Sequence, residues 1–183
     1  MKTYIALFRG INVGGKNIIR MQDLIALLEN LGSRNVKTYI QSGNAVFQNE
    51  IENVPELSNG IRAAIKKRYG FEPHILLLNL AEIEQAIASN PFSEAESEPK
   101  TLHIYFLSSV PSEPDLDLLE NAKQPHERFH LLEKLFYLHA PNGIGRSKLA
   151  ARVEKALGVP VTARNWRTVR KIVEMATFML QLA

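Results

Sequence analysis

The sequence predicts an α+β protein made of two ferredoxin-like units, each with the element order β-α-β-β-α-β. Short runs of strand-forming residues alternate with amphipathic helices, turn residues separate them, and the whole order occurs twice. Such units contain mainly antiparallel sheets. We therefore expect two α+β subdomains, over residues 1–90 and 101–183, with a linker over residues 91–100.

The first strand and the first helix follow from residue type and spacing. Residues 3–8 are rich in Tyr, Ile, Leu and Phe, most of which favour strands. After a Gly-rich loop over residues 10–20, leucines recur at intervals of three and four residues, and Gly32 follows the last of them. This spacing predicts an amphipathic helix that ends at the glycine, which readily adopts the left-handed conformation of a helix C-terminus. The leucines are Leu24, Leu27, Leu28 and Leu31.

A hairpin, a second helix and a fourth strand complete the first unit. Polar and apolar residues alternate over residues 36–40, and Ala45-Val46-Phe47 follows the turn residues Ser42-Gly43-Asn44. This pattern predicts two antiparallel strands joined by a turn. An apolar stripe at helical spacing then leads to Gly70, and residues 73–78 form the last strand of the unit.

The second half repeats this order after an acidic helix over residues 80–88. A strand over residues 102–107 and a short helix over residues 116–122 precede a hairpin whose strands lie on either side of Glu133-Lys134. Residues 91–100 are rich in Pro, Ser and Glu, a composition typical of a linker. The remaining elements are a helix over residues 149–157, a short strand over residues 159–162 and a last helix with its buried face at Trp166, Val169, Val173, Ala176 and Leu180.

Composition and charge limit the class of protein. The 183 residues are 45% hydrophobic and include no Cys, which excludes disulfides, thiolate metal sites and Cys nucleophiles. No apolar run has the ~18–20 residues of a membrane span, and the N-terminus lacks the features of a signal peptide, so we expect a cytoplasmic protein. Lys and Arg outnumber Asp and Glu by 10 to 6 over residues 1–79 and by 10 to 4 over residues 127–183, whereas residues 80–126 have 2 against 9. An acidic middle between basic ends favours electrostatic docking or an anion-binding surface.

The loop over residues 10–17 matches G-x-x-x-x-G-K but has Asn17 where a P-loop has Ser or Thr. A P-loop needs that hydroxyl on Mg²⁺ and leads directly into a helix, and neither condition is met here, which argues against a nucleoside triphosphatase. The consecutive N–H groups of Gly14 and Gly15, with Lys16 beside them, instead predict a nest that binds an anion. The alternative is a mobile loop that uses glycine only for its turns.

Residues 126–130 match the zinc motif H-E-x-x-H. That motif binds zinc on a helix, where the two His share a face about 6 Å apart. The preceding Pro125 and the alternating apolar residues that follow predict a strand instead, which separates the two His by about 13 Å. No metal site is therefore predicted.

A second Gly-rich loop, over residues 142–148, precedes the helix of residues 149–157. Ser147 is a candidate N-cap for that helix, and the exposed amides of a helix start attract anions. The alternative is a capped surface helix that binds nothing. Basic residues near this helix start and the next are Arg146, Lys148, Arg164 and Arg167.

Four strings of this sequence, taken together and in order, resemble those of one protein family. The strings are Arg9-Gly10-Ile11-Asn12-Val13-Gly14-Gly15-Lys16-Asn17, Tyr39-Ile40-Gln41-Ser42-Gly43-Asn44, Gly145-Arg146-Ser147-Lys148-Leu149 and Thr162-Ala163-Arg164-Asn165-Trp166. On these strings the chain is identified as similar to the domain of unknown function 1697 family, small bacterial proteins without an assigned activity. The resemblance implies a bacterial cytosolic α+β protein and supplies no catalytic residues.

The predicted topology places the two N-terminal loops at the same end of one sheet. In a ferredoxin-like unit the first and second strands run parallel, so the loop after the first strand lies near the turn after the second. Asn, Gln and Ser side chains there supply hydrogen bonds, and Arg and Lys neutralise negative charge. We therefore predict a binding protein for a phosphate-bearing ligand, either a nucleotide or a nucleic acid, with no cofactor. The alternatives are an enzyme that acts on a phosphorylated small molecule and a structural or partner-binding protein. The predicted ligand-binding residues are Arg9, Asn12, Gly14, Gly15, Lys16, Asn17, Arg20, Gln41, Ser42 and Asn44, extended by Arg146, Ser147, Lys148, Arg164 and Arg167.

Overall fold

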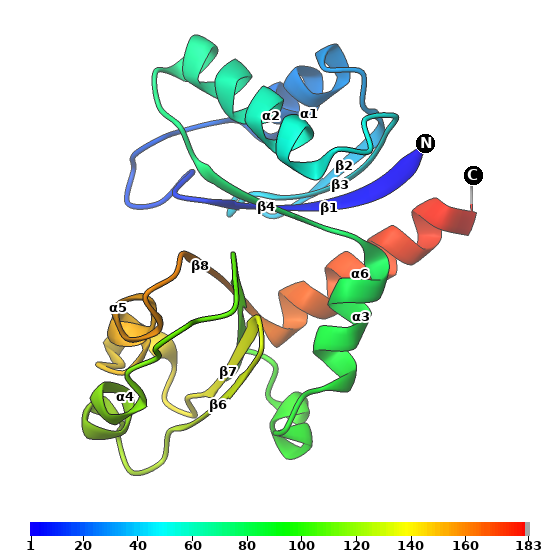
Figure 1. The fold of residues 1–183 in the computed structure, drawn as a ribbon. Coiled ribbons are helices and arrows are strands. Elements are labelled where there is room, and N and C mark those ends of the chain that lie inside the picture. The colour runs from blue at the N-terminus through cyan, green and yellow to red at the C-terminus, as the bar shows by residue number, and fades with distance from the viewer. Residues whose placement is uncertain (182–183) are drawn as a thin grey trace. The chain divides into compact units, whose positions relative to one another are not determined.

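The computed structural model describes residues 1–181, which form two compact units (Figure 1). Unit 1 comprises residues 1–84 together with the chain from Lys171 onward, and unit 2 comprises residues 85–170. Each unit is described by itself.

Unit 1 has the ferredoxin-like topology that the sequence predicts. Its four strands lie in the order β2-β3-β1-β4, and every neighbouring pair is antiparallel. Because β1 and β2 are both antiparallel to β3, they run parallel to each other, as the site prediction requires. The elements are β1 (Lys2–Arg9), α1 (Met21–Asn30), β2 (Arg34–Tyr39), β3 (Asn44–Asn49), α2 (Val54–Tyr69) and β4 (His74–Leu78).

The core of unit 1 lies between the sheet and the two helices α1 and α2, which cover one face of it (Figure 1). Alternate residues of β1, namely Tyr4, Ala6 and Phe8, point into this core and are almost fully buried. The helices contribute leucines and isoleucines such as Leu28 and Ile61. Burying each such side chain stabilises the fold by roughly 1.5–3 kcal/mol.

Unit 2 repeats the topology. Its strands lie in the order β6-β7-β5-β8, again with antiparallel neighbours, so its first, second, third and fourth strands occupy the same places as those of unit 1. The predicted duplication is therefore confirmed. The elements after β4 are α3 (Leu80–Ala88), the 3₁₀-helix η1 (Ser93–Ser97), β5 (Leu102–Leu107), α4 (Leu116–Ala122), β6 (Arg128–Leu132), β7 (Leu135–His139), the 3₁₀-helices η2 (Ile144–Arg146) and η3 (Ala150–Arg152), α5 (Val153–Leu157), β8 (Val161–Asn165) and α6 (Trp166–Gln181).

The compact units divide the chain at positions other than the predicted subdomain limits. Helix α6 begins in unit 2 and ends in unit 1, so residues from 171 onward group with the N-terminal sheet rather than with residues 101–170. Within residues 91–100, predicted as a linker, the 3₁₀-helix η1 forms, and Phe92 and Ala95 are buried. The ring of Phe92 packs against that of His139 at a centroid distance of 6.3 Å. Where independently folding domains begin and end stays a prediction.

Some local details differ from the sequence prediction. The helix expected over residues 149–157 is α-helical only over Val153–Leu157, and the 3₁₀-helix η3 precedes it. Strand β8 begins at Val161 and continues to Asn165, because Pro160 cannot donate to the ladder and the strand starts just after it. On α6, Leu180 is 47% exposed while Met179 is 2% exposed, so the buried stripe continues from Ala176 by a step of three residues rather than four. Of the helices in residues 1–181, none is long and apolar enough to cross a membrane.

Candidate functional site

The loop after β1 is a small hairpin closed by a glycine pair. Gly14 and Gly15 both have positive φ angles, +59° and +74°, and the amide of Lys16 donates to the carbonyl of Val13 over 3.1 Å. This combination is typical of the tight two-residue turn that glycine pairs favour. The two glycines thus form the turn of this loop, and the turn fixes the direction of their amides.

Asn12 ties this loop to the neighbouring hairpin. Its side-chain amide donates to the carbonyl of Ile19 over 2.9 Å and to that of Gln41 over 2.8 Å, while its oxygen accepts from the amide of Ile19 over 2.8 Å. Asn17 similarly donates to the carbonyl of Gly10 over 2.8 Å. The amide groups of both Asn side chains are therefore occupied in bracing the loop.

The turn between β2 and β3 packs directly under the first loop. The amide of Phe8 donates to the carbonyl of Gly43 over 2.8 Å. Gly43 has φ +79°, and a Cβ atom there would lie 2.6 Å from Cδ1 of Ile11, so only glycine fits. Asn44 is buried, and its amide donates to the carbonyl of Tyr39 over 3.0 Å and to the hydroxyl of Ser42 over 3.3 Å. The structure thus brings the two predicted loops together.

Cations gather at this end of unit 1. Residues 9–20 contain Arg9, Lys16 and Arg20 but no Asp or Glu, and all three cationic residues are exposed. In the part of the chain that the structure describes, the side chains of Lys16 and Arg20 form no ion pair or hydrogen bond, and the amides of Gly14 and Gly15 have no acceptor. The nearest acidic residue along the chain, Asp23, is paired with Arg68 at 3.3 Å.

The predicted residues of the second half belong to unit 2 and differ in exposure. Ser147 is buried, and its hydroxyl accepts from the amide of Ala150 over 3.0 Å at the start of η3. It is not the N-cap of the α-helix, because α5 begins only at Val153 and its N-cap residue is Arg152. Arg164 on β8 donates to the carbonyl of Ala163 over 2.8 Å, and burial lowers its pKa to about 10. It therefore stays charged at neutral pH. The exposed cations of the set are Arg146, Lys148 and Arg167.

The H-E-x-x-H segment is not helical, and it is extended only in its second part, because His126 lies in a turn. Residues from Arg128 onward form β6, and Glu127 is buried with its carboxylate accepting from the amide of Gln124 over 3.0 Å. Glu127, the acidic residue of the motif, thus stabilises the turn that precedes β6.

A charged cluster in unit 2 was not predicted from the sequence. The guanidinium of Arg128 contacts the carboxylate of Glu94 and lies 2.9 Å from Nδ1 of His139. The ring of Phe92 lies 4.8 Å from the same guanidinium. The hydrogen bond from Arg128 lowers the pKa of Glu94, while burial, followed by the charge of Arg128, lowers the pKa of His139. No sequence signal links residues from such distant segments.

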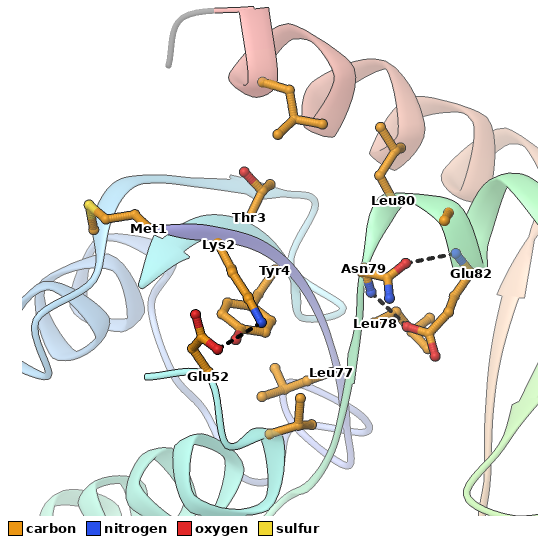
Figure 2. Close-up of a pocket in the computed structure, with 13 residues that line it drawn as sticks. Met1, Lys2, Thr3, Tyr4, Glu52, Leu77, Leu78, Asn79, Leu80 and Glu82 are labelled. Carbon is orange, nitrogen blue, oxygen red and sulfur yellow. Dashed lines mark hydrogen bonds and ion pairs between the residues drawn. The ribbon is translucent and has the colours of Figure 1, made fainter. Parts of the chain in front are cut away.

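A cavity of about 490 Å³ in unit 1 was also not predicted from the sequence (Figure 2). Its lining comes from four separate stretches of the chain, which explains why no local motif marks it. One signal was available: Asn79 followed three residues later by Glu82 predicts a helix start. In the structure each of these two side chains accepts from the other residue's amide, over 2.8 and 2.9 Å. The lining residues are Met1, Lys2, Thr3, Tyr4, Glu52, Val54, Leu77, Leu78, Asn79, Leu80, Ala81, Glu82 and Leu180.

The chain is a duplicated α+β protein, because each of its two units contains an antiparallel sheet of ferredoxin-like topology. Residues 1–137 match the family described as Protein of unknown function (DUF1697), and the chain belongs to this family. It is also similar to the solved structure of a conserved bacterial protein from Streptococcus pneumoniae, at 27% sequence identity and a TM-score of 0.65. That likeness covers 95% of this chain and 98% of that chain. No curated protein matches the sequence.

Proposed function

We propose that this protein binds a phosphate-bearing ligand, a nucleotide or a nucleic acid, at the end of the unit 1 sheet where the β1–α1 loop meets the β2–β3 turn. The observation that carries the proposal is the combination of free amides at Gly14 and Gly15 with the unpaired cations of Lys16 and Arg20. Both amides and both cations belong to residues 1–181, within which they have no partner.

The chemistry of this loop suits an anion rather than a neutral ligand. Backbone amides in a turn whose donors point outward form a concavity for negative oxygens. Arg20 is also the N-cap residue of α1, and no side chain caps that helix start, so the positive end of the helix dipole adds to the field. A charge-assisted hydrogen bond to phosphate is about twice as strong as a neutral one.

The Asn side chains have a supporting part in this proposal. Since the amides of Asn12 and Asn17 are engaged within the loop, they set its shape rather than contact the ligand. Gln41 and Ser42 are exposed on the adjacent turn, and Asn12 joins the loop to this turn by its bond to the carbonyl of Gln41. Ligand contact is therefore assigned to the cations, the glycine amides and this turn.

The test is a titration followed by ¹H–¹⁵N NMR, with inorganic phosphate, a nucleoside triphosphate and a short duplex DNA as separate probes. We expect saturable shifts at the Gly14 and Gly15 amides, and a loss of affinity of at least fivefold in Lys16→Ala and Arg20→Ala. Lys67→Ala is the matched control, because Lys67 is an exposed lysine on α2 of the same unit and has no ion pair with any residue from 1 to 181. Equal losses in Lys16→Ala and Lys67→Ala, or no shift at low salt, would contradict the proposal.

Salt dependence separates the two ligand classes. Each phosphate neutralised on duplex DNA contributes about 0.9 to the slope of log affinity against log salt. If a nucleic acid is the ligand, the Lys16→Ala variant should lower that slope by about one. A nucleotide should instead bind with a shallow slope and shift only the loop amides.

A further inference from the structure

Strand β1 has an open edge at its N-terminal end. It pairs with β3 from Lys2 onward, but with β4 only from Ile5 onward, where Ile5 lies opposite Leu78. After Leu78 the chain turns away into α3. Three residues at the start of β1 therefore have a neighbouring strand on one side only.

The hydrogen-bond pattern shows which backbone groups face this open edge. The amide of Phe8 donates to Gly43 on the β3 side. Because backbone groups alternate in direction along an antiparallel strand, even-numbered residues of β1 bond to β3 and odd-numbered residues face β4. The backbone groups of Ile5 face Leu78 of β4. Thr3 lies two residues earlier, and on that side no strand within residues 1–181 lies opposite it. The N–H and C=O of Thr3 thus point to the open side.

The cavity lies along that edge. Figure 2 shows the start of β1 on one side of it, the Leu78–Glu82 segment on the other, and a side chain of α6 above. Leu180 belongs to the lining and comes from that helix. The hydroxyl oxygen of Thr3 is itself buried and forms no hydrogen bond within residues 1–181. Thr3 therefore brings three unused polar groups to an otherwise largely aliphatic cavity.

The charged side chains that line the cavity already have partners, so the site favours a neutral ligand. Lys2 and Glu52 form an ion pair at 3.1 Å. The first turn of α3 is closed by the reciprocal hydrogen bonds of Asn79 and Glu82, which leaves no anion site there. Neither this ion pair nor the closed first turn of α3 is left to attract a phosphate.

We propose that this cavity binds a short, uncharged, extended peptide segment with aliphatic side chains, which adds to the open edge of β1. A peptide bond offers the acceptor and donor that complement the N–H and C=O of Thr3, as in strand addition to a sheet edge. Aliphatic side chains on the segment then contact Leu77, Leu80 and Leu180. The open stretch of three residues is about 10 Å long at 3.3 Å per residue, which sets the segment at about three residues. A volume of about 490 Å³ lies within the range of ligand cavities.

The experiment uses the full chain and the peptide acetyl-Leu-Val-Leu-amide. We expect a saturable shift of the Thr3 amide resonance and at least a tenfold slowing of its hydrogen exchange. The same peptide with an N-methylated valine has the same apolar surface and loses one N–H, so it should bind at least tenfold more weakly. An unmoved Thr3 amide, or equal affinity for the two peptides, would overturn the proposal.

A matched pair of variants tests the cavity wall. Leu180→Glu places a charge in the lining, and because Leu180 is 47% exposed the substitution is compatible with folding. Gln181→Glu adds the same charge at an exposed position outside the lining. We expect at least a tenfold loss of affinity in the first variant and no change in the second; similar effects in both would count against this site.

Discussion

The side-chain amide of Asn12 donates to the main-chain carbonyl of Gln41 over 2.8 Å, although 29 residues separate them. The same side chain holds both backbone groups of Ile19. One residue thus fixes the β1–α1 loop against the β2–β3 turn, and the geometry of the proposed anion site depends on it.

Replacing Asn12 should destabilise unit 1 in two separable ways. Asn12→Gly removes three hydrogen bonds and should lower the free energy of unfolding by about 1–3 kcal/mol. Asn12→Ala should cost about 1 kcal/mol more, because residue 12 has φ +54° and alanine is strained there. Urea denaturation of both variants measures the difference. An alanine variant as stable as the glycine variant would show that the loop relaxes.

Gly43 and Gly14 form a matched pair for testing how closely the loops pack. Both have positive φ, but a Cβ at Gly43 meets Ile11 and Phe8 within 3 Å, whereas a Cβ at Gly14 meets nothing within 4 Å. Gly14→Ala should therefore show backbone strain alone, and Gly43→Ala should be less stable than it by a further 1–3 kcal/mol or so. Thermal unfolding of the two variants gives the comparison. Equal stabilities would mean that the turn moves away from the loop at little cost.

The sequence predicts an element well where a local residue pattern determines that element. It predicts the structure less well where the structure depends on contacts between residues far apart in the chain. The leucines of α1 and the alternation in β1 mark their elements because each follows the period of its own backbone. The juxtaposition of Asn12 and Gln41 follows from topology alone. The bracing role of Asn12 does not, since a free asparagine and a bonded one look the same in a sequence.

The cavity and the Arg128 cluster show more clearly which features the sequence does not predict. Thr3, Leu80 and Leu180 come from both ends of the chain and the middle, and only the folded unit assembles them. Leu180 also breaks the helical period that predicts its burial, because at the end of α6 the buried position passes to Met179. Tertiary packing there overrides the local pattern.

Two buried tyrosine hydroxyls should contribute unequally to stability. Tyr137 is fully buried, and its hydroxyl donates to the carbonyl of Ala86 on α3 over 2.7 Å. In Tyr137→Phe that carbonyl loses its partner without access to water, so we expect a loss of about 1–3 kcal/mol. Tyr4→Phe in unit 1 breaks a bond of the same length to Ile51, which is only partly buried, and should cost less. Chemical denaturation of both variants gives the ranking; a larger loss in Tyr4→Phe would contradict it.

His103 should make the stability of the protein depend on pH below neutrality. It lies on β5, is 7% exposed, and its Nδ1 is buried without a hydrogen-bond partner among the described residues. Burial lowers its pKa to about 4, against a usual value of 6.5 that we assign to the unfolded chain. Between these two values the unfolded state binds more protons than the folded state, so the free energy of unfolding falls as the pH falls from 6.5 to 4. The loss from this residue amounts to about 3 kcal/mol when complete.

The variant His103→Gln separates this effect from general acid unfolding. It removes the titrating group, so its stability should vary less with pH between 4 and 6.5 than that of the wild type. His130→Gln is the matched control, because His130 is an exposed His on β6 of the same unit. Urea denaturation at half-unit steps of pH measures both slopes. If His103→Gln keeps the full wild-type slope, the proton that unfolds the protein binds elsewhere.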